Sequence, residues 1–208
     1  MRIKNWTILL LSFLALTVEA QNQWCASYGD FLAGQWQMID GEFSFSSVKN
    51  RGLLFILHSD NKEIRKNLKK HSFLLTYSDS LYLNLRPLEV FCNDGFVRVW
   101  AFEDGRLLFA RPDVAPSTFF SIGYGGSSIP LSPKMFKSKS KLENLVCYVL
   151  SPREGHDDPA ISKIRESDME VLLKDYPDLV SKYNEYPRKR REAADVVLSL
   201  LLEAGLIK

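Results

Sequence analysis

The strongest constraint on this chain is a series of short apolar segments between residues 73 and 111, each separated from the next by a turn signal. In residues 81–85 leucine occupies every second position, which is the period of a β-strand. Asp104 and Gly105 tolerate the positive φ that a tight hairpin turn needs. The series predicts an antiparallel meander. Several segments are apolar at both odd and even positions, which face opposite sides of a sheet, so we expect other parts of the chain to cover both faces.

Segments on either side of this series extend the prediction. Residues 43–46 alternate, and residues 53–57 and 145–150 are apolar runs, so three further strands are expected. Residues 61–70 carry two apolar side chains four positions apart among basic ones, which predicts a short helix with a basic outer face. We expect that face to be solvated, with a ligand surface as the alternative. Residues 21–40 are compatible with a short helix or an irregular segment.

The carboxy-terminal part is predicted to be helical. Ser167 and Glu170 have the spacing of a capping box, Pro177 suits the first position of a helix, and Gly205 suits a helix stop. Four basic residues at 188–191 lie in the first turn of the last predicted helix, where the helix dipole disfavours positive charge. We interpret them as a solvated patch or as a contact for an acidic partner.

Together these segments predict an α+β fold. We expect a largely antiparallel sheet of about five to seven strands, backed by carboxy-terminal helices. Residues 21–150 should form the β-rich part, and residues 151–208 a helical segment packed on the sheet.

Residues 1–20 have the pattern of a secretory signal peptide. Arg2 and Lys4 precede an apolar run at residues 6–18, which is too short to span a bilayer. Val18-Glu19-Ala20 places small residues where a signal peptidase cuts. We therefore expect a mature chain that starts at Gln21, is secreted or periplasmic, and has no transmembrane anchor.

The charge of the mature chain argues against nucleic acid as a partner. Without residues 1–20 the chain keeps 25 of its 27 basic and 24 of its 25 acidic residues, a net charge of +1. A nearly neutral chain offers no electrostatic footprint for nucleic acid or for a membrane surface.

Three cysteines, Cys25, Cys92 and Cys147, lie in a chain that we expect to reach an oxidising compartment. They allow three single pairings with one thiol left over, and the alternative is that they are buried free thiols. No C-x-x-C spacing occurs, so the sequence does not predict a thiolate zinc site.

No catalytic constellation stands out. Residues 46–49 match S-x-x-K and residues 59–61 match S-D-N, two motifs of penicillin-reactive serine acylases. Their spacing is wrong for that chemistry, Ser46 lies in a predicted strand rather than at a helix start, and no K-T-G follows. We expect no cofactor. An enzyme with unassigned residues, such as a small hydrolase, remains the alternative to a non-enzymatic protein.

Two weaker sets of candidate site residues remain. His156, Asp157 and Asp158 place possible metal ligands together, although a hydrophilic turn before Pro159 explains them as well. Exposed aromatic rings suit a protein or glycan partner. The candidates for such a surface are Tyr82, Trp100, Phe119, Phe120 and Tyr124, of which Tyr124 lies in a glycine-rich segment and Trp100 has core packing as its alternative.

Several motifs resemble a family of uncharacterised secreted proteins from Gram-negative gut-type bacteria. They lie at residues 76–84, 104–106, 123–128, 147–150 and 169–179. The resemblance covers residues 43–183 and leaves out the basic segment at 188–191 and the last helix. It implies an exported bacterial protein of unknown activity. The leading functional hypothesis is therefore a secreted or envelope module that binds a partner or contributes to surface structure.

Overall fold

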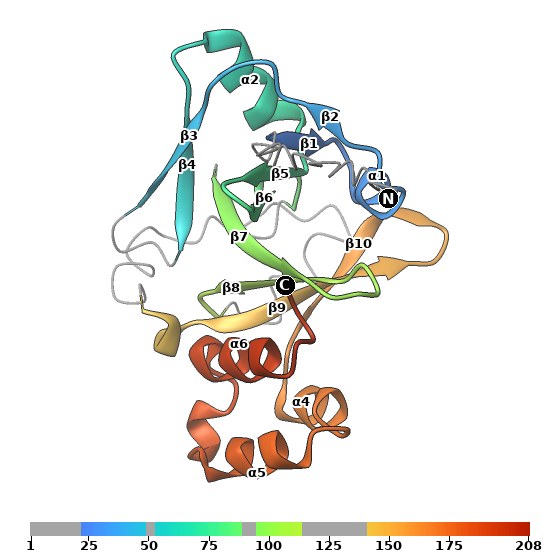
Figure 1. The fold of residues 1–208 in the computed structure, drawn as a ribbon, viewed down its shortest axis with the longest axis vertical. Coiled ribbons are helices and arrows are strands. Elements are labelled where there is room, and N and C mark those ends of the chain that lie inside the picture. Colours follow the sequence, from blue (N-terminus) through green and yellow to red (C-terminus); the bar gives the residue numbers. More distant parts are fainter. Residues whose placement is uncertain (1–21, 49–52, 89–94, 114–140) are drawn as a thin grey trace, which may run out of the picture.

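The computed structural model describes residues 22–48, 53–88, 95–113 and 141–208 (Figure 1). Within these ranges a ten-stranded antiparallel sheet combines with two helices from its amino-terminal half and three helices that follow the last strand. The predicted α+β class, with a largely antiparallel sheet backed by carboxy-terminal helices, is confirmed.

The strands are β1 (Gln23–Cys25), β2 (Gln37–Met38), β3 (Ser44–Ser47), β4 (Leu54–His58), β5 (Leu74–Tyr77), β6 (Ser80–Asn84), β7 (Phe96–Ala101), β8 (Leu107–Arg111), β9 (Val146–Arg153) and β10 (His156–Lys163). The helices are α1 (Tyr28–Leu32), α2 (Lys62–His71), α4 (Glu166–Leu172), α5 (Pro177–Glu185) and α6 (Ala194–Glu203), with 3₁₀ turns η1 (Arg86–Leu88), η3 (Leu142–Asn144) and η4 (Arg188–Arg190).

Strand β7 is the branch point of the sheet. One of its edges pairs with β6 along residues 96–99. The other edge pairs with two strands in succession, because β4 meets Phe96 and Val97 while β8 meets the residues from Val99 to the end of β7. The main path therefore runs β10-β9-β8-β7-β6-β5-β1-β2, and the β3–β4 hairpin leaves it at β7.

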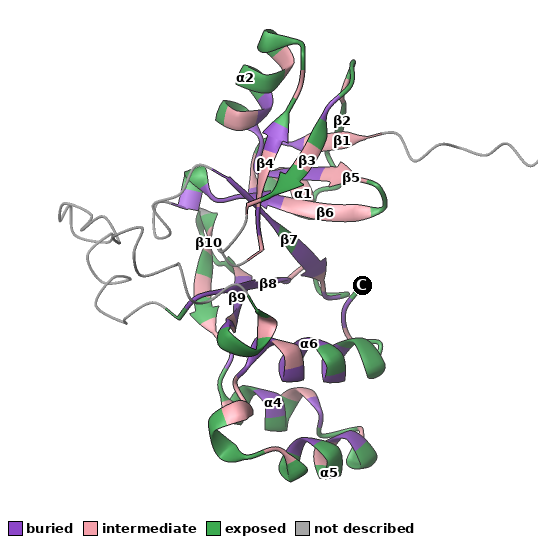
Figure 2. Ribbon diagram, turned by 90° about the vertical axis from the view of Figure 1, so that its left-hand side faces the viewer, coloured by how far each residue is buried: buried purple, intermediate pink, exposed green. Residues whose placement is uncertain are grey.

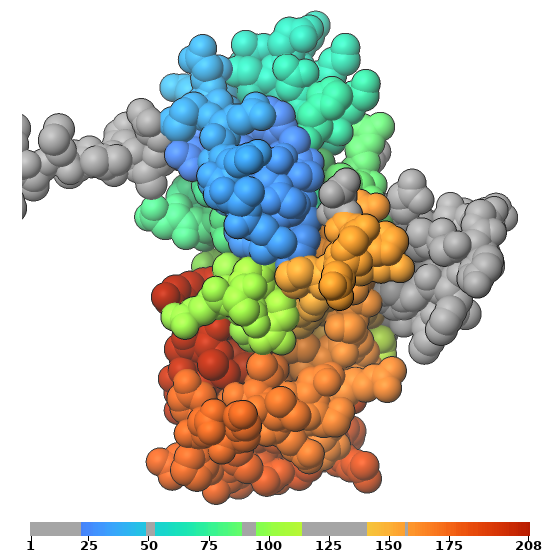
Figure 3. All heavy atoms as spheres, turned by 90° about the vertical axis from the view of Figure 1, so that its right-hand side faces the viewer, coloured from blue at the N-terminus to red at the C-terminus, as the bar shows by residue number. Residues whose placement is uncertain are grey.

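One face of the main path forms a continuous apolar surface. Two rows of cross-strand partners form this face, and each residue in them is at most 2% exposed. The rows are Cys25, Leu74, Leu83 and Val97 on β1, β5, β6 and β7, and Val99, Phe109 and Tyr148 on β7, β8 and β9. The sheet curls around this face. Figure 3 shows α1 beside the β9–β10 turn, and the hydroxyl of Tyr28 in α1 donates to the carbonyl of Gly105 at 3.0 Å. Burial raises the pKa of that Tyr28 phenol to about 12.

The opposite face is covered in two separate places. Leu108, Ala110, Cys147 and Val149 of β8 and β9 pack against the carboxy-terminal helices. Helix α6 lies directly against this part of the sheet, with α4 and α5 beyond it (Figure 2). At the other end, the β3–β4 hairpin and α2 cover β5, β6 and the start of β7. The expectation that both faces of the sheet are covered is confirmed.

The strands predicted from alternation and apolar runs are present, but three others escaped prediction. Strands β1 and β2 are short, and α1 between them begins at Ser27, whose hydroxyl accepts from the amide of Asp30 at 3.0 Å. Strand β10 is an edge strand that contains Pro159 and lacks apolar alternation. The expected boundary at residue 150 falls inside β9, and the first carboxy-terminal helix begins at Glu166.

The N-cap of helix α4 is Arg165, two residues before the predicted N-cap Ser167. The carboxylate of Asp168, not the side chain of Glu170, reaches back to the helix start and accepts from the amide of Arg165 at 2.8 Å. Pro177 occupies the predicted first position of α5. Gly205 has φ +69°, and the amide of Leu206 donates to the carbonyl of Leu201 at 3.0 Å, so the predicted helix stop after α6 is confirmed.

The basic segment at 188–191 finds acidic contacts within its own chain. Arg191 and Arg188 both pair with Glu166 at the start of α4, and Arg190 pairs with Asp195 in the first turn of α6. The residues form the turn η4 rather than the start of the last helix, which removes the predicted conflict with the helix dipole. These ion pairs join α4 to the turn that leads into α6.

The two cysteines in the described ranges are free thiols. Cys25 and Cys147 are fully buried and belong to apolar clusters on opposite faces of the sheet. Burial raises the pKa of the Cys25 thiol to about 12 and also raises that of Cys147. Their environment is that of the buried apolar cysteine that the sequence offered as an alternative, while Cys92 lies outside the described residues.

Packing of α6 on the sheet predicts different costs for two leucines of that helix. Leu200 is fully buried, so Leu200→Ala should lower the free energy of unfolding by about 2–5 kcal/mol because it leaves a cavity. Leu202 is 47% exposed, and Leu202→Ala should change it by less than about 0.5 kcal/mol. Urea unfolding measures both. Equal effects of the two variants would show that the helices do not pack on the sheet as described.

The ion pairs of Glu166 predict a pH-dependent contribution to stability. The hydrogen bond from Arg191 lowers the pKa of the Glu166 carboxyl below its ordinary value of 4.5, so its stabilisation is complete above that value and is lost as the pH falls through the lowered pKa. Glu166→Gln should therefore be less stable than wild type at pH 7, with the difference shrinking below pH 4.5. Glu170→Gln, on the same helix, is the control. Thermal unfolding across this pH range tests it, and a pH-independent difference would contradict it.

Candidate functional site

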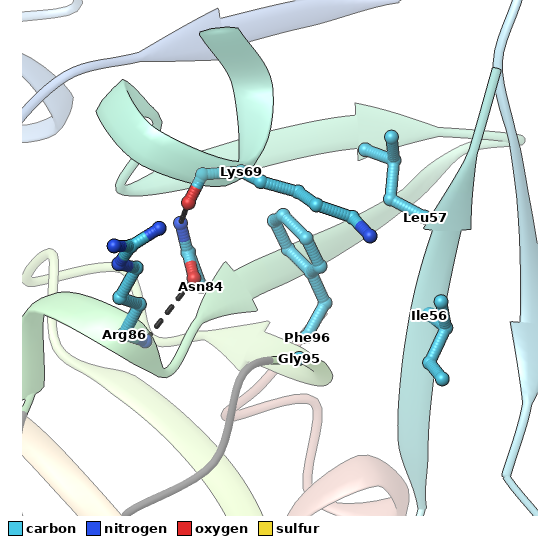
Figure 4. A pocket seen from close by; sticks show the side chains of 7 residues that line it. All are labelled: Ile56, Leu57, Lys69, Asn84, Arg86, Gly95 and Phe96. Carbon is cyan, nitrogen blue, oxygen red and sulfur yellow. Dashed lines mark hydrogen bonds between the residues drawn. The ribbon is translucent and has the colours of Figure 1, made fainter. Parts of the chain in front are cut away.

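A pocket of about 110 Å³ lies where α2 crosses the ends of β4, β6 and β7 (Figure 4). We call it the α2 pocket. Its lining residues are Ile56, Leu57, Lys69, Asn84, Arg86, Gly95 and Phe96. They come from four stretches that are separated in sequence, so the pocket exists only once β4 and α2 have packed on the sheet.

Helix α2 is positioned over the sheet by its cap and by one apolar residue. The side chain of Asn61 accepts from the amides of Glu63 and Ile64 at 2.9 and 3.3 Å, which fixes the start of the helix. Leu68 is 3% exposed and packs with Leu57 and other residues of the cluster beneath the helix. The next residue, Lys69, therefore lies at the border between that cluster and solvent.

Apolar side chains and one glycine form the base of the pocket. Leu57 and Phe96 are each 1% exposed. Gly95 lies so close to β4 that a Cβ atom there would be 2.6 Å from Cδ1 of Leu54 and 3.2 Å from the carbonyl oxygen of Phe55. A larger residue at this position would force Leu54 and the backbone of β4 to shift, so the close approach of the two strands favours glycine.

Asn84 holds the polar side of the pocket together. Its amide nitrogen donates to the carbonyls of Lys69 and Ser72 at 3.1 and 2.9 Å, and its carbonyl oxygen accepts from the amide of Arg86 at 3.1 Å. The residue is 1% exposed. One buried side chain therefore fixes the end of α2 and the start of η1, the two backbones that carry the cationic residues of the pocket.

Two cations flank the pocket. Figure 4 shows the side chain of Lys69 extending past the ring of Phe96 toward Leu57, while Arg86 lies on the other side of Asn84. Lys69 is half-buried and Arg86 is exposed. Neither makes an ion pair with an acidic side chain in the ranges that the structure describes. The site therefore combines apolar walls with two positive charges.

An aromatic cluster adjoins the pocket through Phe96. The ring of Phe45 in β3 stacks on Tyr82 in β6 at a centroid distance of 4.3 Å and lies 5.2 Å from Phe96. Burial raises the pKa of Tyr82, and the nearby Arg98 partly opposes that shift. Tyr82, predicted as an exposed recognition residue, is thus half-buried between the hairpin and the sheet.

The other predicted aromatic candidates lie elsewhere. Trp100 is 9% exposed and belongs to the core between sheet and helices, with the guanidinium of Arg98 5.3 Å from its ring centroid. This placement matches core packing rather than an exposed recognition surface. Phe119, Phe120 and Tyr124 lie outside the described residues.

His156, Asp157 and Asp158, the weak candidates for metal ligands, lie at the start of β10. His156 and Asp158 are exposed at the start of β10, and the side chain of Asp157 is outside the described set. In the described part of the chain, no group of three or more histidine, cysteine or acidic side chains could hold a metal ion.

A serine and a histidine meet on the outer side of the β3–β4 hairpin. The hydroxyl oxygen of Ser46 lies 2.7 Å from Nε2 of His58, and both side chains are exposed. His58 also borders a wide depression of about 440 Å³ that contains Asp40, Glu42 and Asp60. Among the described residues, no carboxylate is hydrogen-bonded to His58. Ser46 and His58 are thus as close as the nucleophile and the base of a catalytic triad, but the acidic group that orients the base in a triad is not found among the described residues.

A separate ion network links the strands near the end of β8. Lys163 of β10 pairs with Asp113 at 3.2 Å and with Glu192 at 2.8 Å, and the hydroxyl of Tyr148 donates to Asp113 at 3.4 Å. Burial of Arg111 at the end of β8 lowers the pKa of its guanidinium to about 10, so it stays cationic at neutral pH. The network joins β10 to the segment before α6, so we assign it a structural role.

Fold and site together define the protein as an antiparallel α+β domain with a small, cation-flanked pocket. Residues 23–208 match the model described as "Family of unknown function (DUF6563)", and the chain belongs to that family. Comparisons with curated proteins and with solved structures each gave no significant match. The match extends to residue 208, so the basic segment and the last helix are part of the family pattern, contrary to the narrower resemblance in the sequence analysis.

Sequence reasoning missed the residues of the α2 pocket. The spacing of basic residues in α2 predicts a solvated face, with a ligand surface as the alternative. Asn84 was visible only as a polar position between two leucines of a strand. Arg86 carried no local signal, because its relation to α2 depends on the hydrogen bonds of Asn84.

The hydrogen bonds of Asn84 predict a large cost for its removal. Asn84→Ala should lower the free energy of unfolding by about 1–3 kcal/mol for each backbone group left without a partner in the interior. Asn67→Ala removes the same side chain from an exposed position of α2 and should change stability little. Urea unfolding measures both variants. A cost for Asn84→Ala no greater than for Asn67→Ala would contradict the role assigned to Asn84.

Proposed function

We propose that this protein is an exported, non-enzymatic module that binds a small ligand in the α2 pocket. The observation that carries the proposal is the composition of the pocket: apolar walls, a fixed polar side and two cations at the rim, with no serine, threonine, cysteine or acidic side chain among the described lining residues. Ligand sites of proteins combine mostly apolar walls with a few placed polar groups.

Export is supported by the signal-peptide pattern of residues 1–20. No helix in the described ranges has the length and apolar character to cross a bilayer, which is compatible with a chain released after cleavage. The mature chain would begin at Gln21, next to the matched family region that starts at residue 23. A protein that acts outside the cytoplasm and binds a small ligand fits a role in capture or sensing at the envelope.

A serine hydrolase is the second candidate, favoured by the contact between Ser46 and His58. Two features weigh against it. The pair lies on the exposed side of a hairpin instead of in a pocket that excludes water, and no carboxylate in the described ranges orients the histidine. The α2 pocket, in contrast, is enclosed on one side by fully buried side chains.

The two candidates give opposite results with the mature chain, residues 21–208. A fluorophosphonate probe, followed by peptide mass spectrometry, should leave Ser46 unmodified, and a library of small metabolites screened by amide NMR should shift the resonances around Lys69, Asn84 and Phe96. Modification of Ser46 that is lost in His58→Ala would overturn the binding proposal in favour of hydrolysis. Secretion of a product with Gln21 at its amino terminus checks the export part.

A further inference from the structure

We infer that the ligand of the α2 pocket is a small organic carboxylate with a short apolar body. The inference rests on the proposed function and adds the chemical class of the ligand. Its starting point is Figure 4, where the side chain of Lys69 extends past Phe96 toward Leu57 and Arg86 lines the opposite side of the pocket, beyond Asn84.

The charge of the site calls for an anion. Basic residues of the carboxy-terminal part pair with acids of this chain: Arg190 and Arg191 with Asp195 and Glu166, and Lys182 with Glu203 at 2.5 Å. Lys69 and Arg86 have no such acidic partner among the described residues. Two positive charges at the rim of one pocket favour a negatively charged ligand.

The volume of the α2 pocket limits the size of the apolar group that the anion carries. About 110 Å³ is somewhat less than the roughly 150 Å³ cavity that holds a benzene ring in another protein. A short branched or small cyclic hydrocarbon group fits this space against Leu57 and Phe96. A nucleotide or a sugar phosphate is too large to enter it.

The hydrogen-bond pattern favours a carboxylate over phosphate. Many phosphate sites add clusters of free backbone amides to their cationic side chains, as at helix amino termini and in glycine-rich loops. Here the amide of Arg86 already donates to Asn84, and the nearby end of α2 presents carbonyls, two of which accept from Asn84. The site thus offers side-chain charges and apolar walls, which suit an amphipathic monoanion.

Asn84 is a positioning residue in this arrangement. By binding the carbonyls of Lys69 and Ser72 it occupies acceptors at the end of α2 whose partial negative charge would repel an anion. By accepting from the amide of Arg86 it fixes the backbone from which that side chain extends. Both effects fix the backbones of the two cations on opposite sides of one pocket.

The test is an amide NMR titration of the mature chain with isovalerate, with its neutral isostere isovaleramide and with inorganic phosphate. Isovalerate should bind with a millimolar dissociation constant and shift amides at Lys69, Arg86 and Phe96, while isovaleramide and phosphate should bind at least about tenfold more weakly. Lys69→Gln and Arg86→Gln should each weaken isovalerate binding about fivefold to tenfold. Lys69→Arg should largely restore it.

Lys66→Gln is the matched control, since Lys66 is exposed on the same helix and does not line the pocket. Equal loss of binding in Lys66→Gln would overturn the inference, because it would indicate unspecific attraction to the basic helix. Binding of isovaleramide as tight as that of isovalerate would overturn the carboxylate assignment and leave the binding module intact, and stronger phosphate binding would do the same. If no ligand of the screen shifts the pocket, the proposed function itself fails.

Discussion

The structure depends on the backbone hydrogen bonds of β7. One edge of this strand is taken by β6, and the other is divided between β4 at its beginning and β8 toward its end. Because a strand edge offers one set of donors and acceptors, β4 and β8 must diverge where they meet. The β3–β4 hairpin is thereby directed over β5 and β6, while β8 and β9 continue toward the carboxy-terminal helices.

The same branch creates the α2 pocket. Strand β4 approaches β7 closely at Gly95, and α2 follows β4 directly, so the helix is carried over the ends of β6 and β7. Asn84 then joins the end of α2 to the segment after β6. The cations of the site come from these two joined backbones. A ligand bound there would contact both sides of the junction, which links its affinity to the stability of the hairpin.

Local patterns of the sequence were informative where burial is regular. Alternation at residues 81–85 and the apolar runs on either side located most strands, and Pro177 and Gly205 marked helix ends correctly. Candidate site residues were located less well. Trp100 proved to be core, since a strand residue faces solvent or core according to what packs above it, and that is a long-range property. Likewise, nothing in the sequence distinguishes Lys69, which lines the pocket, from the other basic residues of the same helix face.

The sequence by itself determined the α+β class, the meander and the carboxy-terminal helices, because periodicity and turn chemistry act over a few residues. It also carries the signal-peptide pattern on which the export proposal rests. Only the tertiary structure decided that β10 extends the sheet, that the basic segment at 188–191 pairs with Glu166 and Asp195, and that Lys69, Asn84 and Arg86 meet. Edge strands and ion pairs depend on residues distant in sequence, whose approach is set by packing and by the division of one strand edge between two partners.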